Sequence, residues 1–313
     1  MSKNILVTGG AGFIGSNTVD LLVSKGYNVT VIDNLSTGKR ENINKKAKFI
    51  FSDILDVGNY INKIKNIEGV IHCAAQISVV KSVEDPANDA MTNVIGTLRL
   101  LEACRTNNIK KFVFASTGGA IYGSAPKTFP IKENQIESPE SPYAVSKKSV
   151  EIYLDFYRRT YGMDCISLRY SNVYGPRQDH LGEAGVIAIF ISRLLKNQNP
   201  FIFGDGSQTR DFVYVEDVAM ANLKALGKKT AFKKINIGTG KQTNINNLLL
   251  KIKSIIHKEN IKTIYRKARK GEVMFSSLDI ALVGKELGWK PKTSLDKGLR
   301  STFEWFRMQN LYK

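Results

Sequence analysis

The segment Thr8-Gly9-Gly10-Ala11-Gly12-Phe13-Ile14-Gly15 decides the fold that the sequence predicts. It follows the short apolar run Ile5-Leu6-Val7 and opens a stretch, 12–25, with a helical pattern. Its glycines satisfy both G-x-x-G-x-x-G and G-x-G-x-x-G, so spacing alone leaves the two patterns open. In either pattern the missing Cβ atoms let the backbone approach a pyrophosphate, and the helix N-terminus offers it unpaired N–H groups.

Short apolar runs alternate with helical patterns along the first half of the chain. We expect strands at 5–7, 28–32, 49–51, 69–72, 111–115 and 165–168, and helices at 12–25, 86–107 and 143–161. This alternation is typical of a parallel sheet covered on both faces, because parallel connections cross over through helices. The predicted fold is therefore α/β: a doubly wound parallel sheet followed by a smaller, less regular α+β domain.

Asp33 ends the second expected strand, 18 residues after Gly15. A carboxylate there would accept hydrogen bonds from the ribose of adenosine and repel a 2′-phosphate, which favours NAD over NADP. Lys39 and Arg40 follow in the loop and keep NADP open as an alternative. Asp33-Asn34 is also ordinary turn chemistry, so the assignment depends on the glycine turn before it.

Tyr143 and Lys147 form the pattern Y-x-x-x-K in the helix expected between the fifth and sixth strands. Residues four apart share a helix face, and Ser141-Pro142 resembles a helix start. A free tyrosine has a pKa of about 10, and a neighbouring ammonium lowers that pKa by favouring the phenolate. The pair therefore predicts a base for a sugar hydroxyl, although the same pattern also occurs on surface helices.

The composition excludes several classes of protein and site. The net charge of +18 comes from scattered basic residues without a long run, which favours solvated lysines over a nucleic-acid interface. Three cysteines and three histidines match no disulfide or zinc spacing, so we expect no metal. With no signal peptide before Asn4 and no apolar stretch of membrane length, we expect a cytoplasmic protein without membrane contact.

Taken together, these residues resemble the extended short-chain dehydrogenase/reductase family, and within it the UDP-glucose 4-epimerases. The resemblance covers nearly the whole chain. It rests on the segments Thr8–Gly15, Asp33–Gly38, His72–Ala75, Asn93, Tyr143–Lys147, Leu168–Pro176 and Thr209–Val213. It implies a Rossmann domain for NAD at 1–169, which the chain re-enters near 212–237, and a nucleotide-sugar-binding domain at 170–313.

The resemblance also assigns residues to the cofactor and to catalysis. It implies cofactor contacts from the glycine turn (Gly9, Gly12, Phe13, Ile14, Gly15) and from Asp33, Asn34, Leu35, Ser36, Thr37, Gly38, Asp53, Ile54, Cys73, Ala74, Ala75, Gln76, Asn93, Tyr143, Lys147 and Tyr170. A Ser or Thr hydroxyl should assist Tyr143 and Lys147. Counting from Phe114 gives Thr117, whereas counting back from Tyr122 gives Gly118, so one residue is extra; we prefer Thr117, with Ser116 in reserve.

On the substrate side, the resemblance implies that Asn172 and Arg210 hold a diphosphate and that Arg269 and Glu272 hold the rest of a UDP group. Ser276 lies near the position that sets the size of the sugar pocket, where a small residue would leave room for an N-acetyl group. The segment after the fifth strand lacks the Thr-Asp-Glu of the related 4,6-dehydratases, which disfavours dehydration.

The function that follows from this resemblance is 4-epimerisation of a UDP-hexose through a 4-keto intermediate with bound NAD, as in galactose metabolism. A homodimer packed through helices near 87–107 and 143–161 is implied as well. Two alternatives stay open: another sugar-nucleotide enzyme, such as a reductase, a decarboxylase or an epimerase of a different nucleotide sugar, and a non-catalytic relative that binds nucleotides or RNA.

Overall fold

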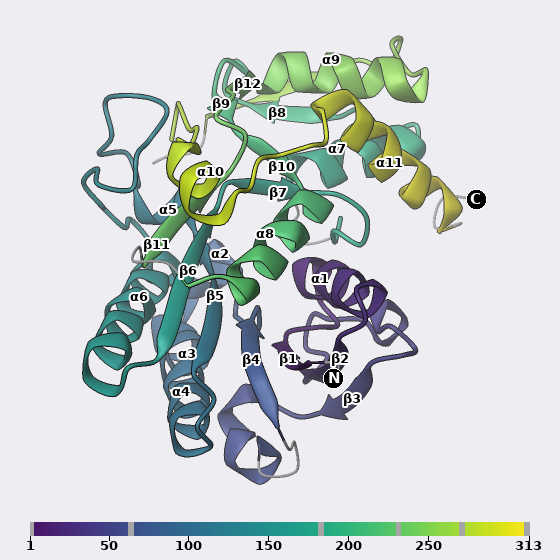
Figure 1. Ribbon diagram of the computed structural model, residues 1–313. Helices are drawn as coiled ribbons and strands as arrows, with labels where there is room; N and C mark the ends of the chain where they lie inside the picture. The colour runs from purple at the N-terminus through teal and green to yellow at the C-terminus, as the bar shows by residue number, and fades with distance from the viewer. Residues whose placement is uncertain (1–2, 62–65, 181–184, 230–232, 269–272, 310–313) are drawn as a thin grey trace.

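The structure is a computed structural model that describes residues 3–61, 66–180, 185–229, 233–268 and 273–309. Within these residues, seven parallel strands form one sheet in the order β11-β6-β5-β4-β1-β2-β3 (Figure 1). These strands are β1 (Asn4–Thr8), β2 (Asn28–Asp33), β3 (Lys48–Phe51), β4 (Ile67–His72), β5 (Lys111–Thr117), β6 (Asp164–Tyr170) and β11 (Lys234–Ile237). The strand order reverses between β1 and β4, and open α/β sheets bind their ligands at such a point.

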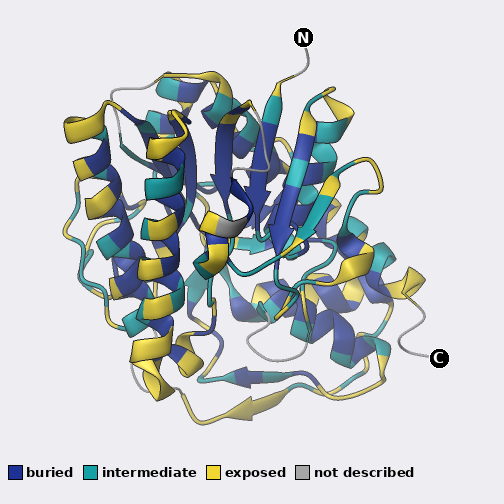
Figure 2. Cartoon of the chain, turned by 90° about the horizontal axis from the view of Figure 1, so that it is seen from below, coloured by how far each residue is buried: buried dark blue, intermediate teal, exposed yellow. Residues whose placement is uncertain are grey.

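Helices cover both faces of this sheet, as the alternating pattern predicts. On one face lie α1 (Phe13–Ser24) and α8 (Val215–Gly227), and on the other α4 (Gly96–Thr106) and α6 (Pro142–Tyr161). Successive residues of a strand pack into different cores. Val7 packs toward α1 and α8, whereas Leu6 packs toward α4 and α6. Figure 2 shows the central strands mostly buried and the outer helix faces exposed. The predicted doubly wound α/β fold is confirmed.

The region expected as one helix at 86–107 is interrupted by a π-helical segment. It consists of α3 (Pro86–Ala90), the π-helix η4 (Met91–Ile95) and α4. A π-turn inserts an extra residue into the helical ladder and re-aims the side chains around it. Here the re-aimed side chain is Asn93, which is 3% exposed and bonds back to the segment after β4. Hydrophobic periodicity does not report such an insertion.

The second half of the chain builds a separate core beyond β6 and also supplies β11 to the main sheet. That core is formed mainly by α7 (Val186–Leu195), α9 (Ile245–Ile256) and α11 (Leu295–Met308). Three strand pairs accompany it: β7 (Asn172–Tyr174) with β10 (Phe212–Tyr214), β9 (Thr209–Arg210) with β12 (Thr243–Asn244), and β8 (Phe201–Phe203) with β13 (Ile264–Arg266).

The remaining elements are short and mostly flank the sheet. They are α2 (Val79–Glu84), α5 (Gly118–Ile121), α10 (Ala281–Leu287) and the 3-10 segments η1 (Arg40–Asn42) and η2 (Ile54–Asn59). None of the helices in the described ranges combines the length and the apolar character needed to cross a membrane.

Candidate active site

The turn between β1 and α1 leaves no room for a side chain at Gly9 or Gly15. A Cβ atom on Gly15 would lie 2.1 Å from the Gly9 carbonyl oxygen, and one on Gly9 would lie 2.5 Å from the Ala74 nitrogen. Gly9 also has a φ of +67°, in the left-handed region. Because the N-cap residue of α1, Gly12, has no side chain to cap the helix, the N–H groups of its first turn suit an anion. This turn therefore fits the pyrophosphate of a dinucleotide.

Asp33 connects that turn to the loop after β2. One carboxylate oxygen accepts a hydrogen bond from the Ala11 N–H at 2.9 Å and the other from the Leu35 N–H at 2.8 Å. Leu35 has a φ of +57°, and a Cβ on Gly38 would lie 2.9 Å from the Asp33 carboxylate, so the loop folds closely around it. A carboxylate has about four acceptor positions, so two remain for ribose hydroxyls.

The other residues expected around adenosine lie in neighbouring loops. The Asn34 amide donates to Asp53 at 2.7 Å, and Asp53 caps η2 by accepting the Leu55 N–H. Ser36 and Thr37 are exposed, and Ile54 is buried. These loops follow β2 and β3, at the carboxyl edge of the sheet.

Cys73, Ala74 and Ala75 follow β4, and Gln76 anchors them to the π-helical segment. The Gln76 N–H donates to the Asn93 side-chain oxygen, and the Asn93 amide donates to the Gln76 carbonyl, both at 2.9 Å. This reciprocal pair holds the small residues of the segment in place. Two of the residues expected from the resemblance are thus joined across 17 positions of sequence.

Lys147 lies beside Tyr143 on the buried side of α6. Its ammonium nitrogen is 5.8 Å from the centre of the Tyr143 ring and donates to the Ala115 carbonyl at 2.9 Å. Burial lowers the pKa of Lys147 to about 8, against the opposing influence of Cys73, Asp89 and Glu151. The lysine is therefore still mainly cationic at pH 7, and a cation at this place favours the phenolate of Tyr143.

Ser116 and Thr117 end β5 and have different hydrogen-bond partners. The Ser116 hydroxyl donates to the Glu151 carboxylate at 2.7 Å in the interior. The Thr117 hydroxyl oxygen caps α5 by accepting the Ala120 N–H at 3.3 Å, which leaves its proton for another acceptor. The next residue, Gly118, packs against Leu278, since a Cβ on it would lie 2.5 Å from a Leu278 methyl carbon.

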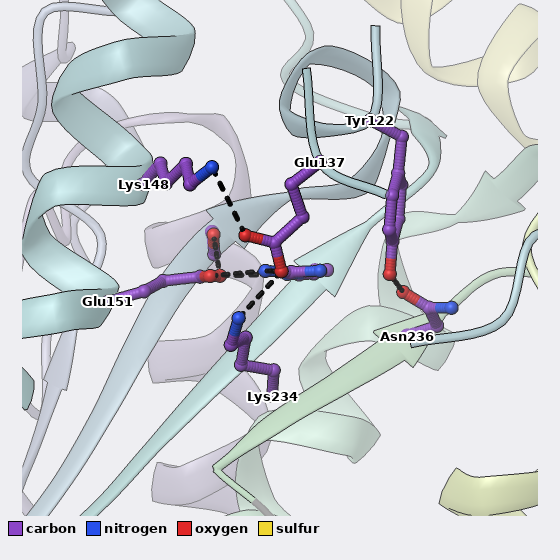
Figure 3. A network of polar contacts seen from close by, with 8 residues as sticks. Tyr122, Glu137, Lys148, Glu151, Lys234 and Asn236 are labelled. Atoms are coloured by element: carbon purple, nitrogen blue, oxygen red, sulfur yellow. Dashed lines mark hydrogen bonds and ion pairs between the residues drawn. The ribbon is translucent and has the colours of Figure 1, made fainter. Parts of the chain in front are cut away.

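An ionic network centred on the buried Arg169 of β6 reaches α6 and β11, and sequence reasoning missed it. The Arg169 guanidinium, whose side chain is fully buried, binds Glu151 at 2.5 Å and Glu137 at 2.6 Å. Figure 3 shows Glu137 lying between Lys234 and Lys148, with Glu151 reaching in from α6. One feature of the sequence could have indicated the network. Tyr143, Lys147 and Glu151 are spaced four residues apart, which places three polar residues on one helix face.

The expected substrate residues Asn172 and Arg210 lie on neighbouring pairs of strands. The Asn172 N–H donates to the Asp211 carbonyl at 2.9 Å, and an Arg210 guanidinium nitrogen donates to the Val273 carbonyl at 2.7 Å. Ser276 is buried three residues further on. The other two expected residues, Arg269 and Glu272, lie outside the described residues.

Asp211 holds these segments together, and it too was missed. Its fully buried carboxylate accepts the N–H groups of Thr239, Gly240 and Leu278. It thereby joins the strand of Arg210 to the loop after β11 and to the segment of Ser276. These partners are 28 to 67 positions away in sequence, so no local pattern indicates them.

The side chain of Tyr170, another expected cofactor residue, lies in a core. Its ring packs in the core between the sheet and helices α1 and α8, and its hydroxyl donates to Asn222 of α8 at 2.7 Å. A cofactor contact at this position would therefore come from the backbone.

Comparison with known proteins identifies the family of the chain. Residues 5–238 match the family described as the NAD dependent epimerase/dehydratase family. A UDP-glucose 4-epimerase from Thermotoga maritima, solved with UDP-glucose, is 50% identical, with a TM-score of 0.95 over 98% of this chain and 99% of that one. A UDP-N-acetylglucosamine 4-epimerase from Methanobrevibacter ruminantium, in complex with UDP-N-acetylmuramic acid, is 40% identical, with a TM-score of 0.93 over 98% and 99%.

A third similar structure contains the expected cofactor. It is the UDP-glucose 4-epimerase of Thermus thermophilus in complex with NAD, which is 42% identical to this chain. Its TM-score is 0.88, and the match covers 97% of this chain and 99% of that one. The resemblance proposed from the motifs is confirmed by these matches.

Proposed function

Because the chain belongs to the NAD-dependent epimerase/dehydratase family, we propose that it interconverts UDP-glucose and UDP-galactose, as galactose metabolism requires. Its enzymatic character and its use of NAD agree with the expectations from the glycine turn and Asp33. We assign NAD binding to residues 1–169 and nucleotide-sugar binding to 170–313. The observation that carries the proposal is the buried Lys147 ammonium 5.8 Å from the Tyr143 ring.

The chemistry requires a base that works in both directions. Bound NAD supplies reversible hydride transfer. The Tyr143 phenolate removes the proton of the sugar 4-hydroxyl, and Lys147 stabilises that phenolate. Thr117 donates a hydrogen bond to the same sugar oxygen, with Ser116 in reserve. The 4-keto sugar then turns about its bond to the diphosphate and presents the opposite face of C4 for reduction, and Tyr143 returns the proton to the 4-oxygen.

The diphosphate has to stay bound while the sugar turns. Arg210 and Asn172 are assigned to it, because a guanidinium binds phosphate oxygens in a bidentate manner and an amide donates to them. Arg269 and Glu272 are assigned to the second phosphate contact and the uridine ribose. Asp211 supports this arrangement by fixing the strand of Arg210.

The sugar pocket is proposed to accept an N-acetyl group. Ser276 is small, buried and placed on the segment that Asp211 connects to Arg210. The similarity to a UDP-N-acetylglucosamine 4-epimerase supports this assignment. Turnover of UDP-glucose and UDP-N-acetylglucosamine at comparable rates is expected, and complete rejection of the acetylated sugar would exclude it.

The direct experiment is incubation of the purified protein with UDP-glucose, UDP-galactose and the two N-acetylated sugars. Proton NMR of the products should show inversion at C4 alone, without net consumption of NADH. Tyr143→Phe should lower kcat by about 10³-fold while leaving NAD bound, because it removes only the proton-transferring group. Full activity of this variant would contradict the role of Tyr143.

We also propose a homodimer packed through the helices near 87–107 and 143–161, which include η4, α4 and α6. Exposed apolar side chains on these helices include Met91, Ile95, Ile152 and Phe156. Because η4 and α4 pack against α6, these side chains lie on adjoining helices, and exposed apolar surface commonly marks a protein interface. Sedimentation should give twice the chain mass, and Ile152→Glu should give the monomer mass.

A further inference from the structure

A fully buried carboxylate, Asp89, lies between the cofactor side of the site and the helix of Lys147. Its first oxygen accepts hydrogen bonds from the side-chain amides of Gln76 and Asn93, both at 2.9 Å. Its second oxygen accepts the Ser146 hydroxyl at 2.6 Å. All three donors are neutral, so they solvate the carboxylate without cancelling its charge.

These three donors belong to different parts of the site. Gln76 ends the segment that follows β4, Asn93 lies on the π-helical turn, and Ser146 directly precedes Lys147 on α6. Asp89 thus connects the segment expected to border the cofactor with α6, the helix that carries Tyr143 and Lys147. The partners are 13, 4 and 57 positions away in sequence.

Among the described residues that act on Lys147, Asp89 is a carboxylate whose hydrogen-bond donors are all neutral. In the part of the chain that the structure describes, the titratable groups that interact with the lysine include Tyr143 and Glu151 of α6, Asp89 of α3, and His72 and Cys73 at the end of β4. Burial lowers the pKa of His72 to about 3 and raises the pKa of Cys73 to about 12, so both are neutral at pH 7. The charge of Glu151 is paired with Arg169.

We propose that Asp89 is a positioning residue that keeps Lys147 cationic and holds Gln76 against the catalytic helix. This inference rests on the proposed function for the catalytic role of Lys147. The carboxylate acts through Lys147 and makes no contact with the reacting atoms. Its three hydrogen bonds fix its place, and its charge favours the ammonium form of the lysine.

Asp89→Asn is the test, because it removes the charge and can keep the hydrogen bonds. The amide oxygen can accept from Gln76 and Asn93, and the amide nitrogen can donate to the Ser146 oxygen. Asp85→Asn is the matched control. It removes a carboxylate from the same helix at an exposed position, and asparagine caps a helix as well as aspartate does.

The titration of Lys147 is measured by NMR of protein labelled at the lysine Cε and Nζ atoms, with the signal assigned by its loss in Lys147→Met. In Asp89→Asn the Lys147 pKa should fall by about one unit, and in Asp85→Asn it should stay as in the wild type. An unchanged Lys147 titration in folded Asp89→Asn would overturn the proposal. An equal shift in Ser146→Ala, which keeps the carboxylate, would overturn it as well.

Activity gives a second, separable readout. The alkaline limb of kcat/KM for UDP-glucose should move to lower pH by the same amount in Asp89→Asn, because Lys147 loses its proton earlier. A change in melting temperature alone, with the limb in place, would mark Asp89 as merely structural. Absence of turnover in the wild type would contradict the proposed function but would leave the NMR titration readable.

Discussion

The Ser116 hydroxyl donates to Glu151 at 2.7 Å, and this hydrogen bond holds the Ser116 side chain in the interior of the protein. Glu151 is bound in turn by Arg169, so Ser116 belongs to a buried network of ion pairs. Thr117 follows it at the end of β5 and keeps a hydroxyl proton to donate. Two neighbouring residues of similar chemistry therefore have different hydrogen-bond partners.

Thr117→Ala should lower kcat by about 10²-fold, because it removes a hydrogen-bond donor that stabilises charge developing on the sugar oxygen. Thr117→Ser should retain most of the activity. Ser116→Ala should chiefly lower the free energy of unfolding, since it removes a buried donor to Glu151. Steady-state kinetics with urea unfolding separates the two effects, and a larger loss of kcat in Ser116→Ala would reverse the assignment.

Gly118→Ala should destabilise the protein by about 1–3 kcal/mol, because the new methyl group would overlap the Leu278 side chain. Gly119→Ala is the matched control: nothing lies within 4 Å of its Cβ position, and alanine is the better helix former. Thermal unfolding of both variants measures the difference. Equal melting temperatures would show that Leu278 moves aside without cost.

Arg169→Met should cost about 3–5 kcal/mol, because Glu151 is left in the interior without its cation. The exposed pair of Lys251 and Asp296 provides the control, and Lys251→Met should change stability by less than about 1 kcal/mol. Urea unfolding of both variants tests this. A loss below about 1 kcal/mol in Arg169→Met would show that Glu151 is neutralised in another way.

His72 should make the protein sensitive to acid. It bridges Thr8 at 2.6 Å and Thr97 at 2.8 Å, and burial lowers its pKa to about 3. As the pH falls from about 6.5 to about 3, the unfolded chain takes up the proton before the folded one does. Stability is therefore lost across this window, by up to about 1.4 kcal/mol per pH unit from this group.

His72→Gln removes that titration, so its free energy of unfolding should change less steeply with pH between 6.5 and 4. Urea titrations at several pH values measure the slope. His257→Asn, a change at an exposed histidine, is the control. The same slope in wild type and His72→Gln would show that His72 is not the group that takes up the proton.

Much of the fold could be predicted because its signals are local. The glycine turn and the alternation of strands and helices follow from spacing within a few residues, and burial of the parallel strands follows from their apolar runs. The interruption of the helix at Met91–Ile95 could not be predicted in this way, since apolar spacing does not report a π-turn.

By itself the sequence determined the dinucleotide turn, the acidic residue at the end of β2 and the pairing of Tyr143 with Lys147, because each depends on a short distance along the chain. Only the tertiary structure gave Ser116 and Thr117 different hydrogen-bond partners and revealed the contacts of Asp89. Those contacts join residues 35 and 57 positions apart, Ser116 with Glu151 and Asp89 with Ser146. The physical reason is that a buried polar group is satisfied by whichever donor the folded chain brings near, and the strand order of the sheet sets that proximity.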